Sequence, residues 1–334
     1  MRTPLSILDL VPIARGQTVT DAFAASVAVA RRAEDLGYTR VWYAEHHNMP
    51  SIASAATSVV IAHIGAHTST IRLGAGGIML PNHSPLTIAE QFGALDAMYP
   101  HRIDLGLGRA PGSDQATFRA MRRDPRSSDA FPTDVQELQA YLAGNSRVPG
   151  VDAIPGKGSR VPLYMLGSSL FGAQLAARLG LPYAFASHFA PDALLPAIAA
   201  YRTEFKPSEQ LDRPYLIVGV NVTAADTAAA ASEQFQAVRR ARAISLFSRH
   251  VGIPAEDMTD EQADELLGSA AGMHVDQMLR YAAVGTPGQV GDYLDRFRKQ
   301  TEADELITVH QSSSLEGRLR SITLLAEAMQ TVHA

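Results

Sequence analysis

Residues 71–107 read IRLGAGGIMLPNHSPLTIAEQFGALDAMYPHRIDLGL, and this stretch indicates the fold class. It holds an apolar run from Ile71 to Leu80, a segment of helical periodicity from Ser84 to Met98, and a second apolar run from Ile103 to Leu107. Short apolar runs without polar alternation are typical of strands that are buried on both faces. The stretch therefore predicts a strand–helix–strand unit of a parallel sheet.

The same alternation extends in both directions along the chain. Further strands are predicted at Leu5–Ile13, Arg40–Glu45, Leu163–Leu166, Pro182–Ser187, Tyr215–Val222 and Leu306–His310. Further helices are predicted at Thr20–Gly37, Ser54–His67, Thr133–Leu142, Phe171–Leu179, Asp192–Phe205, Thr227–Leu246 and Gly317–Gln330. Eight strand–helix units predict an α/β fold, most economically a single (β/α)8 TIM barrel. A doubly wound sheet is the alternative, because strand order is not visible in a sequence.

The chain has 334 residues, which exceeds a typical barrel by about 80 residues. The excess falls in three polar or Pro- and Gly-bearing stretches, Pro111–Pro132, Asn145–Pro162 and Ser248–Pro287. The third contains an acidic helix start, so a helical insertion is expected at about 248–287. Because no linker or repeat is visible, we expect one domain over residues 1–334.

Composition narrows the functional classes. A formal charge of −5 argues against nucleic acid as the main partner, because phosphate neutralisation needs a basic surface. The sequence has no cysteine, which excludes disulfides, thiolate nucleophiles, iron–sulfur clusters and cysteine-ligated zinc. We expect a cytoplasmic protein without a membrane partner, since no apolar run reaches membrane-spanning length and Asp9 and Pro12 interrupt the one near the N-terminus.

Polar residues follow five of the predicted strands. In a barrel these strand ends meet at one rim, where catalytic side chains lie. The polar groups are Glu45, His46, His47 and Asn48 after the second strand, Asn82 and His83 after the third, Arg109 after the fourth, Ser168 and Ser169 after the fifth, and Ser187 and His188 after the sixth. For any one histidine, a hydrogen-bonded structural role is as good an interpretation as a functional one.

A metal site is not predicted at this rim. Adjacent residues of a strand face opposite sides, so His46 and His47 cannot both point inward. No His-x-His or His-Glu-x-x-His spacing occurs. We expect His47 to lie on the solvent side or to support another residue.

The glycine- and serine-bearing strand ends favour an anion site over two better-known motifs. Gly106-x-Gly108 lacks the third glycine of a dinucleotide fingerprint, since position 111 is proline. The segment starting at Gly167 lacks the closing glycine of a hydrolase nucleophile elbow. Ser168 and Ser169 precede a predicted helix, whose N-terminus attracts phosphate, and Arg109 can supply a bidentate guanidinium. Plain N-capping is the alternative for the serines.

Glycines interrupt the third predicted strand at Gly74, Gly76 and Gly77. Glycine weakens a strand, and its usual reasons there are a bulge or the close approach of a flat ligand. A planar ring against this strand is one interpretation.

Four segments together resemble the bacterial luciferase-like, flavin-dependent monooxygenases. They are WYAEHH at 42–47, LGAGGIMLP at 73–81, RIDLGLGRAPG at 102–112 and PLYMLGSS at 162–169, and a late VGTP at 284–287 also fits. Their order and spacing span nearly the whole chain. Within the family, the Gly-Arg-Ala-Pro-Gly signature resembles the single-polypeptide group more than luciferase itself.

The resemblance implies a barrel, usually dimeric, that binds reduced FMN from a separate flavin reductase and lets it react with O2. It implies that His46, paired with Glu45, is a catalytic acid/base. It places Gly76 and Gly77 at a non-proline cis peptide against the flavin ring. Arg109, Ser168 and Ser169 fall where the family holds the flavin phosphate.

The sequence departs from luciferase at several points. Position 168 is serine where luciferase has an acidic residue, and position 172 is glycine where a phosphate-binding hydroxyl is expected. The long lid sequence is missing and no cysteine lies near the flavin, so long-chain aldehydes and light emission are not expected.

Three functions follow as hypotheses. The first is an FMN-dependent monooxygenase acting on a small organic substrate. The second is an F420-dependent oxidoreductase, which needs a more basic path for a long anionic tail, and the third is a flavin-binding protein without turnover. We expect Phe23, Met49, His188, Phe189 and the insertion to determine the substrate.

Overall fold

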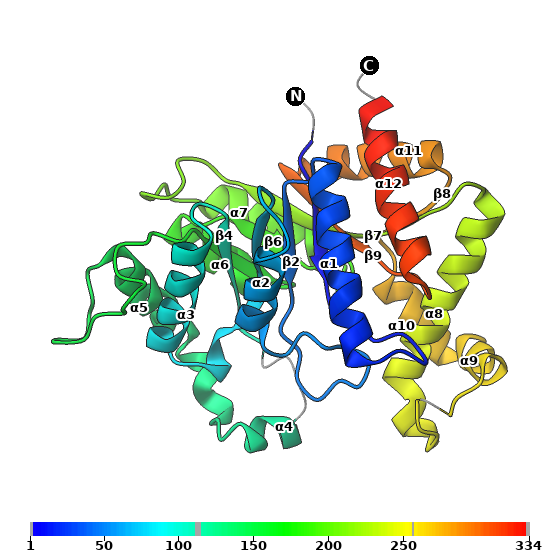
Figure 1. Cartoon of the computed structure of the whole chain (residues 1–334), viewed down its shortest axis with the longest axis horizontal. Helices are drawn as coiled ribbons and strands as arrows, with labels where there is room; N and C mark the ends of the chain where they lie inside the picture. The colour runs from blue at the N-terminus through cyan, green and yellow to red at the C-terminus, as the bar shows by residue number, and fades with distance from the viewer. Residues whose placement is uncertain (1–2, 111–114, 256, 332–334) are drawn as a thin grey trace.

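The computed structural model describes residues 3–110, 115–255 and 257–331, and its parallel strands close into a barrel (Figure 1). The strands are β1 Leu5–Asp9, β2 Arg40–Tyr43, β3 Arg72–Met79, β4 Ile103–Gly108, β5 Leu163–Gly167, β6 Tyr183–Phe185, β7 Leu216–Ala224, β8 Ala282–Gly285 and β9 Glu305–His310. Neighbours pair in the order β1 to β7, then β7 with β9 and β9 with β1. This closure confirms the TIM barrel and excludes a doubly wound sheet, which would leave two open edges.

Helices surround the barrel and follow the strands in turn. They are α1 Val19–Asp35, α2 Thr57–Gly65, α3 Pro85–Met98, α5 Phe131–Ala143, α6 Leu170–Leu179, α7 Leu194–Glu204, α8 Ala228–Val251, α11 Pro287–Thr301 and α12 Leu315–Thr331. Hydroxyl side chains cap many of their first turns, for example Thr18 before α1 and Ser84 before α3. Within the residues described, no helix is long and apolar enough to cross a membrane.

Additional elements lie in the loops. They are the helices α4 Gln115–Ala120, α9 Asp260–Leu267 and α10 Ala270–Met278, and the 3₁₀ turns η1 Leu80–Asn82 and η2 Pro125–Asp129. In Figure 1, α4 and α9 lie at the lower end of the molecule, from which α1 and α12 start. Each helix starts beyond the carboxyl end of its strand, so these insertions gather near that rim. The predicted insertion Pro111–Pro132 begins at residues 111–114, which lie outside the described part.

The segment 248–287 contains a strand as well as helices. β8 pairs with the last four residues of β7, from Asn221↔Ala282 to Ala224↔Gly285, whereas β6 pairs with the first three from Tyr183↔Leu216. The nine-residue strand β7 therefore pairs with two strands on one side, with β6 through its first three residues and with β8 through its last four. The helical insertion expected at about 248–287 contains α9 and α10, and β8 is an additional strand that the sequence did not indicate, because its four residues are too few to stand out as a strand.

The first strand is shorter than its apolar run. β1 ends at Asp9, whose Oδ1 accepts a hydrogen bond from the Val11 backbone N–H at 2.7 Å. Val11 itself has a φ of 51°, in the left-handed region that β-branched residues rarely adopt. The chain turns there, so the predicted strand Leu5–Ile13 extends four residues too far.

Strand alternation sorts side chains into an outer and an inner set. Val41 and Tyr43 of β2 join the large apolar cluster between strands and helices, whereas Trp42 and the following Ala44 join a smaller cluster inside the barrel. The inner cluster also contains Leu8, Tyr164, Ala184, Ile217, Ile307 and Val309. This alternation fixes which rim residues face the barrel mouth.

A buried ionic network fills the barrel interior near the strand starts. Arg40 donates to Asp104 at 2.7 Å and to the Tyr164 hydroxyl at 2.8 Å, and it also pairs with Glu305 at 3.0 Å. Ser6 donates to Glu305 at 2.5 Å. Because this is the N-terminal end of the barrel, the network stabilises the fold and does not belong to a catalytic site. Sequence patterns do not reveal this network, since charged residues at strand starts are commonly exposed.

Candidate active site

His46 and Glu45 lie on opposite sides of the chain that leaves β2. Ala44 belongs to the inner cluster, so Glu45 points outward with Tyr43 and His46 points toward the barrel mouth. The backbone N–H of His46 donates to the Ser54 carbonyl at 3.0 Å, which fixes this turn. His46 is half-buried, and its charge contributes to the lowered pKa of His188, which follows β6. The alternation along the strand puts His46 on the inner side, and its acid/base role stays a prediction.

Glu45 is a buried anchor between β2 and the chain that follows β3. Its Oε2 accepts from the Met79 backbone N–H at 2.9 Å, and its Oε1 accepts from the Asn82 amide at 3.0 Å. His47 Nε2 lies 2.8 Å and His83 Nε2 lies 3.0 Å from Oε1. Glu45 therefore faces away from the mouth and positions the strand end that carries His46. His47 supports Glu45 from a partly exposed position.

These donors keep Glu45 ionised. Burial raises its pKa, but hydrogen bonds from His47, His83 and Asn82 outweigh burial and lower the pKa to about 2. The same contact with Glu45 raises the pKa of His47. A carboxylate held in this state at neutral pH is a fixed negative charge and not a proton carrier.

The glycines of β3 produce a bulge. The peptide bond between Gly76 and Gly77 is cis, and the register with β4 shifts between Ala75 and Ile78. A Cβ at Gly76 would lie 2.8 Å from Leu8 Cδ1 and 2.9 Å from Trp42 Cβ, so glycine is required for these side chains to pack against β3. The bulge is therefore one reason for the glycines, and a flat ligand against them stays a prediction.

Arg109 lies at the start of α6. Its guanidinium carbon is 4.3 Å from the centre of the Phe171 ring, in cation–π geometry. The stacking brings a cation from the end of β4 to the first turn of the helix that follows β5. Arg109 is exposed at this rim, where it can reach an incoming anion.

Ser168 and Ser169 precede α6 without capping it. Ser169 has extended backbone angles at the N-cap, yet its side chain makes no capping hydrogen bond, so the capping alternative does not hold for Ser169. Its carbonyl accepts from the Tyr183 hydroxyl at 3.1 Å, which fixes the turn. Arg109 reaches the same first turn of α6 through its contact with Phe171, and a phosphate site at Arg109, Ser168 and Ser169 stays a prediction. Gly172 is buried in the first turn, where a Cβ would be in ordinary contact with Tyr183 at 3.5 Å.

His188 faces the mouth from the end of β6. It is buried, and burial first, then the charges of Arg242 and His46, lowers its pKa to about 3. Its ring packs edge-on against Phe189 with centroids 5.0 Å apart. Phe189 and Met49 are exposed, whereas Phe23 packs on the outer cluster. His188 is thus a neutral imidazole at neutral pH, and Phe23 lies away from the barrel interior.

Three residues near His188 were not predicted from the sequence. Gly219 of β7 lies close to the Nδ1 edge of the ring, since a Cβ there would be 2.5 Å from His188 Nδ1. Asn221, two residues on, donates to the His188 carbonyl at 2.6 Å. The charge of Arg242 on α8 contributes to the lowered pKa of His188. The usable signal was a glycine and an asparagine inside an otherwise apolar strand.

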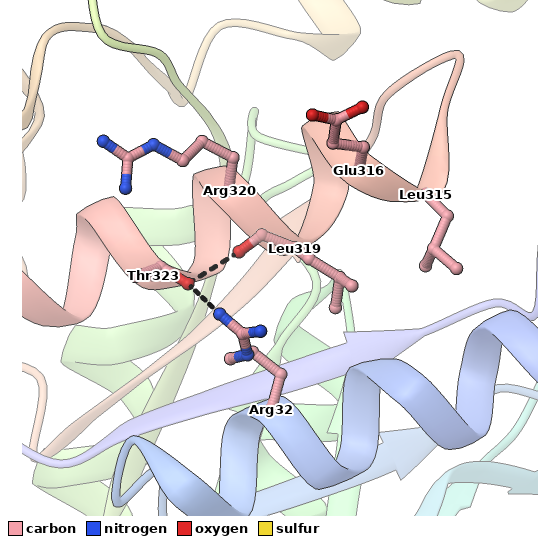
Figure 2. A pocket seen from close by; sticks show the side chains of 6 residues that line it. All are labelled: Arg32, Leu315, Glu316, Leu319, Arg320 and Thr323. Atoms are coloured by element: carbon pink, nitrogen blue, oxygen red, sulfur yellow. Dashed lines mark hydrogen bonds between the residues drawn. The ribbon is translucent and has the colours of Figure 1, made fainter.

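A surface hollow of about 420 Å³ lies away from this rim, on the outside of the barrel between α1 and α12. Figure 2 shows Arg32 of α1 reaching Thr323 of α12 across it, at 3.0 Å. Among the residues whose positions are described, no three histidine, aspartate or glutamate side chains are grouped so that they could hold a metal ion.

The fold and the mouth define a TIM-barrel enzyme with its candidate active site at the carboxyl ends of the strands. A family model described as luciferase-like monooxygenase matches residues 3–304. The chain belongs to the luciferase-like monooxygenase family and is an oxidoreductase, as the sequence resemblance implied.

Individual relatives agree with this assignment. The luciferase-like monooxygenase of Escherichia coli strain K12 is 46% identical over 329 residues, which cover 97% of this chain and 96% of that protein. The N-acetyl-S-alkylcysteine monooxygenase of Bacillus subtilis strain 168 is 39% identical over 194 residues, or 54% of this chain and 56% of that protein. The crystal structure of apo-MsnO8 superimposes with a TM-score of 0.87 at 36% identity, covering 98% of both chains.

Proposed function

We propose that the protein is an FMN-dependent monooxygenase that takes reduced FMN from a separate flavin reductase and oxygenates a small organic substrate with O2. The observation that carries the proposal is Arg109, stacked on Phe171 at the first turn of α6. Monooxygenation is also the reaction named for the Bacillus relative.

The residues at this turn fit a phosphate. The N-terminus of α6 carries unsatisfied N–H groups and a partial positive charge, and Ser169 leaves its hydroxyl uncommitted to the cap. Arg109 adds a full positive charge and a planar set of donors. Ser168 takes the place of an acidic residue in luciferase, so no carboxylate opposes the anion at that position. These groups would hold the phosphate, while the backbone at Gly76 and Gly77 would lie along the ring.

Reduced FMN, when bound, supplies the two electrons that activate O2. The residues of the chain position the reactants and handle protons. His46 faces the mouth and is the acid/base in this proposal, since imidazole is the side chain that most often transfers protons in catalysis. Glu45 accepts a hydrogen bond from the Met79 backbone N–H, which fixes the chain next to His46, so Glu45 acts as a positioning residue.

An F420-dependent oxidoreductase is the second candidate, and one observation favours it. Four arginines lie in the segment after α4 starts, namely Arg119, Arg122, Arg123 and Arg126, and Ser128 in the same segment contacts the Arg109 carbonyl at 3.5 Å. A basic segment of this kind could carry a long anionic tail. The third candidate, flavin binding without turnover, differs only in its kinetics.

The three candidates give different results with purified protein. NADH-dependent oxygen consumption that requires both FMN and an added reductase supports the monooxygenase. Reduction of F420 without oxygen consumption supports the second candidate, and FMN binding without any turnover supports the third.

We also propose that the protein forms a homodimer through α2. Val59 of this helix is 66% exposed although it is apolar, and the neighbouring alanines allow another helix to approach closely. The reductase would then be a transient partner, and the cytoplasm, where NADH-linked reductases work, remains the expected location.

A further inference from the structure

The mouth holds a buried polar group that neither the fold nor the proposed cofactor site explains. The His188 side chain belongs to a residue that is only 7% exposed, and its Nδ1 has no hydrogen-bond partner among the residues described. Burying an imidazole nitrogen without a hydrogen-bond partner is energetically unfavourable. A ligand that supplies the missing polar interaction would remove this penalty.

Two residues of β7, Gly219 and Asn221, hold His188 in this position. Gly219 leaves room for the ring, and the Asn221 amide donates to the His188 carbonyl at 2.6 Å and to the Tyr281 carbonyl at 3.4 Å. Because both bonds come from Nδ2, the orientation of the amide is fixed and Oδ1 faces away from them. Oδ1 is a second buried polar atom without a partner in the described part.

Arg242 brings a positive charge to the same place. It lies on α8, is half-buried, and makes no hydrogen bond or ion pair with the described residues, whereas Arg239 and Arg240 of the same helix pair with Asp276 and Asp264. A partly buried guanidinium without a carboxylate is costly to keep, since its natural partner is a carboxylate or phosphate group. The charge of Arg242 contributes to the lowered pKa of His188, so the two side chains lie close enough to interact electrostatically.

We propose that Arg242 and His188 form a substrate subsite that binds a carboxylate, with Asn221 and Gly219 as positioning residues. Arg242 supplies the charge, and neutral His188 donates a hydrogen bond without adding a second charge. The inference rests on the proposed function only in calling the bound molecule the substrate.

The position of the subsite relates it to the chemistry. His188 follows β6 and His46 follows β2, so they approach the mouth from opposite sides of an eight-stranded barrel. The cofactor phosphate site is on β4 and β5 through Arg109 and α6, separate from α8. A carboxylate bound at Arg242 would leave the rest of a small molecule directed toward His46. The substrate class is therefore a small, largely apolar organic acid.

Binding to the flavin-free protein tests the subsite without depending on the proposed reaction. Titration calorimetry compares sodium hexanoate with hexanamide, which has the same shape and no charge. The wild-type protein should bind hexanoate at least about 10-fold more tightly, the preference expected for a charge-assisted hydrogen bond. Arg242→Met should abolish the preference, and Arg239→Met, on the same helix, should retain it.

Three outcomes would overturn the subsite. They are equal affinity for both compounds in the wild type, a preference that survives Arg242→Met in a folded protein, and a preference that disappears with Arg109→Met instead, which would place the anion at the cofactor phosphate site. Failure of the proposed function looks different, because hexanoate selectivity would persist while reduced FMN failed to bind or to support oxygen uptake.

Discussion

The carboxylate of Glu45 accepts a hydrogen bond from the Met79 backbone N–H at 2.9 Å, which ties the carboxyl end of β2 to that of β3. This bond crosses between the strand that leads to His46 and the strand that carries the Gly76–Gly77 bulge. A carboxylate that would otherwise look catalytic is thus committed to holding two strand ends in place.

Glu45→Gln should destabilise the protein in a pH-dependent way. The folded-state pKa of Glu45 is about 2 against a reference of 4.5, a difference equivalent to about 3 kcal/mol. Because the pKa is lowered by folding, this stabilisation is fully present above about pH 4.5 and is lost as the pH falls toward about 2. Denaturant titrations at pH 7 and pH 3 should show a wild-type advantage that shrinks at the lower pH. An advantage of equal size at both would refute the ionised anchor.

Arg109→Ala should weaken FMN more than riboflavin. The lost group is a charged contact to the phosphate, which riboflavin lacks, so the expected loss is about 1.5–3 kcal/mol for FMN alone. Fluorescence titration with both flavins measures this difference. Arg178→Ala is a matched control, because Arg178 is exposed in the last turn of the same helix and should leave both affinities unchanged. An equal loss for FMN and riboflavin would remove Arg109 from the phosphate site.

His46→Ala should lower turnover by about 10²–10⁴ while leaving the FMN affinity and the unfolding midpoint near wild type. The reason is that His46 faces the mouth and moves protons in our account, whereas Glu45 and His47 hold the structure. His47→Ala is the contrasting variant, since it removes a donor to Glu45 and should lower stability more than rate. If His46→Ala retained full coupled turnover, the catalytic role would be lost and the barrel and flavin assignments would stand.

Gly219→Ala should displace the His188 ring. The added Cβ would lie 2.5 Å from Nδ1 and 3.2 Å from the Phe185 carbonyl oxygen, so one of them must move. Hexanoate binding should weaken, and a crystal structure of the variant should show a different ring position. Gly288→Ala introduces a Cβ with nothing within 4 Å and should change neither. An unmoved ring with unchanged hexanoate affinity would mean that Gly219 has no positioning role.

A mass of about twice 35.8 kDa is expected by light scattering at micromolar concentration. Val59→Asp should shift the protein toward the monomer, because it places a charge on the exposed apolar face of α2. Met273→Asp, at an equally exposed apolar residue of α10, should leave the mass unchanged. A monomeric wild type would exclude the dimer.

The eight barrel strands could be predicted because each is an apolar run between turn residues, and parallel strands buried on both faces leave that pattern. Boundaries were less predictable, since the end of β1 depends on the contact of Asp9 with the Val11 backbone, which periodicity does not report. β8 was missed because its four residues become a strand only by pairing with β7.

The rim residues were predictable to the extent that strand ends converge in a barrel. The role of each rim residue was not predictable, because the role depends on the direction in which the side chain points. Glu45 looked like a partner of His46, and the structure turns it toward Met79 and Asn82. Arg242 could not be found at all, since an arginine in a long polar helix has no signature until the fold brings it to His188.

The most direct test of the central claim supplies the protein with reductase-generated FMNH₂, ¹⁸O₂ and a panel of small apolar carboxylic acids with their amides, and analyses the products by mass spectrometry. Our account predicts a product that gains one ¹⁸O atom only when both the reductase and FMN are present, with an acid preferred over its amide. Anaerobic reduction of F420, without labelled product or oxygen uptake under the FMN conditions, would contradict it.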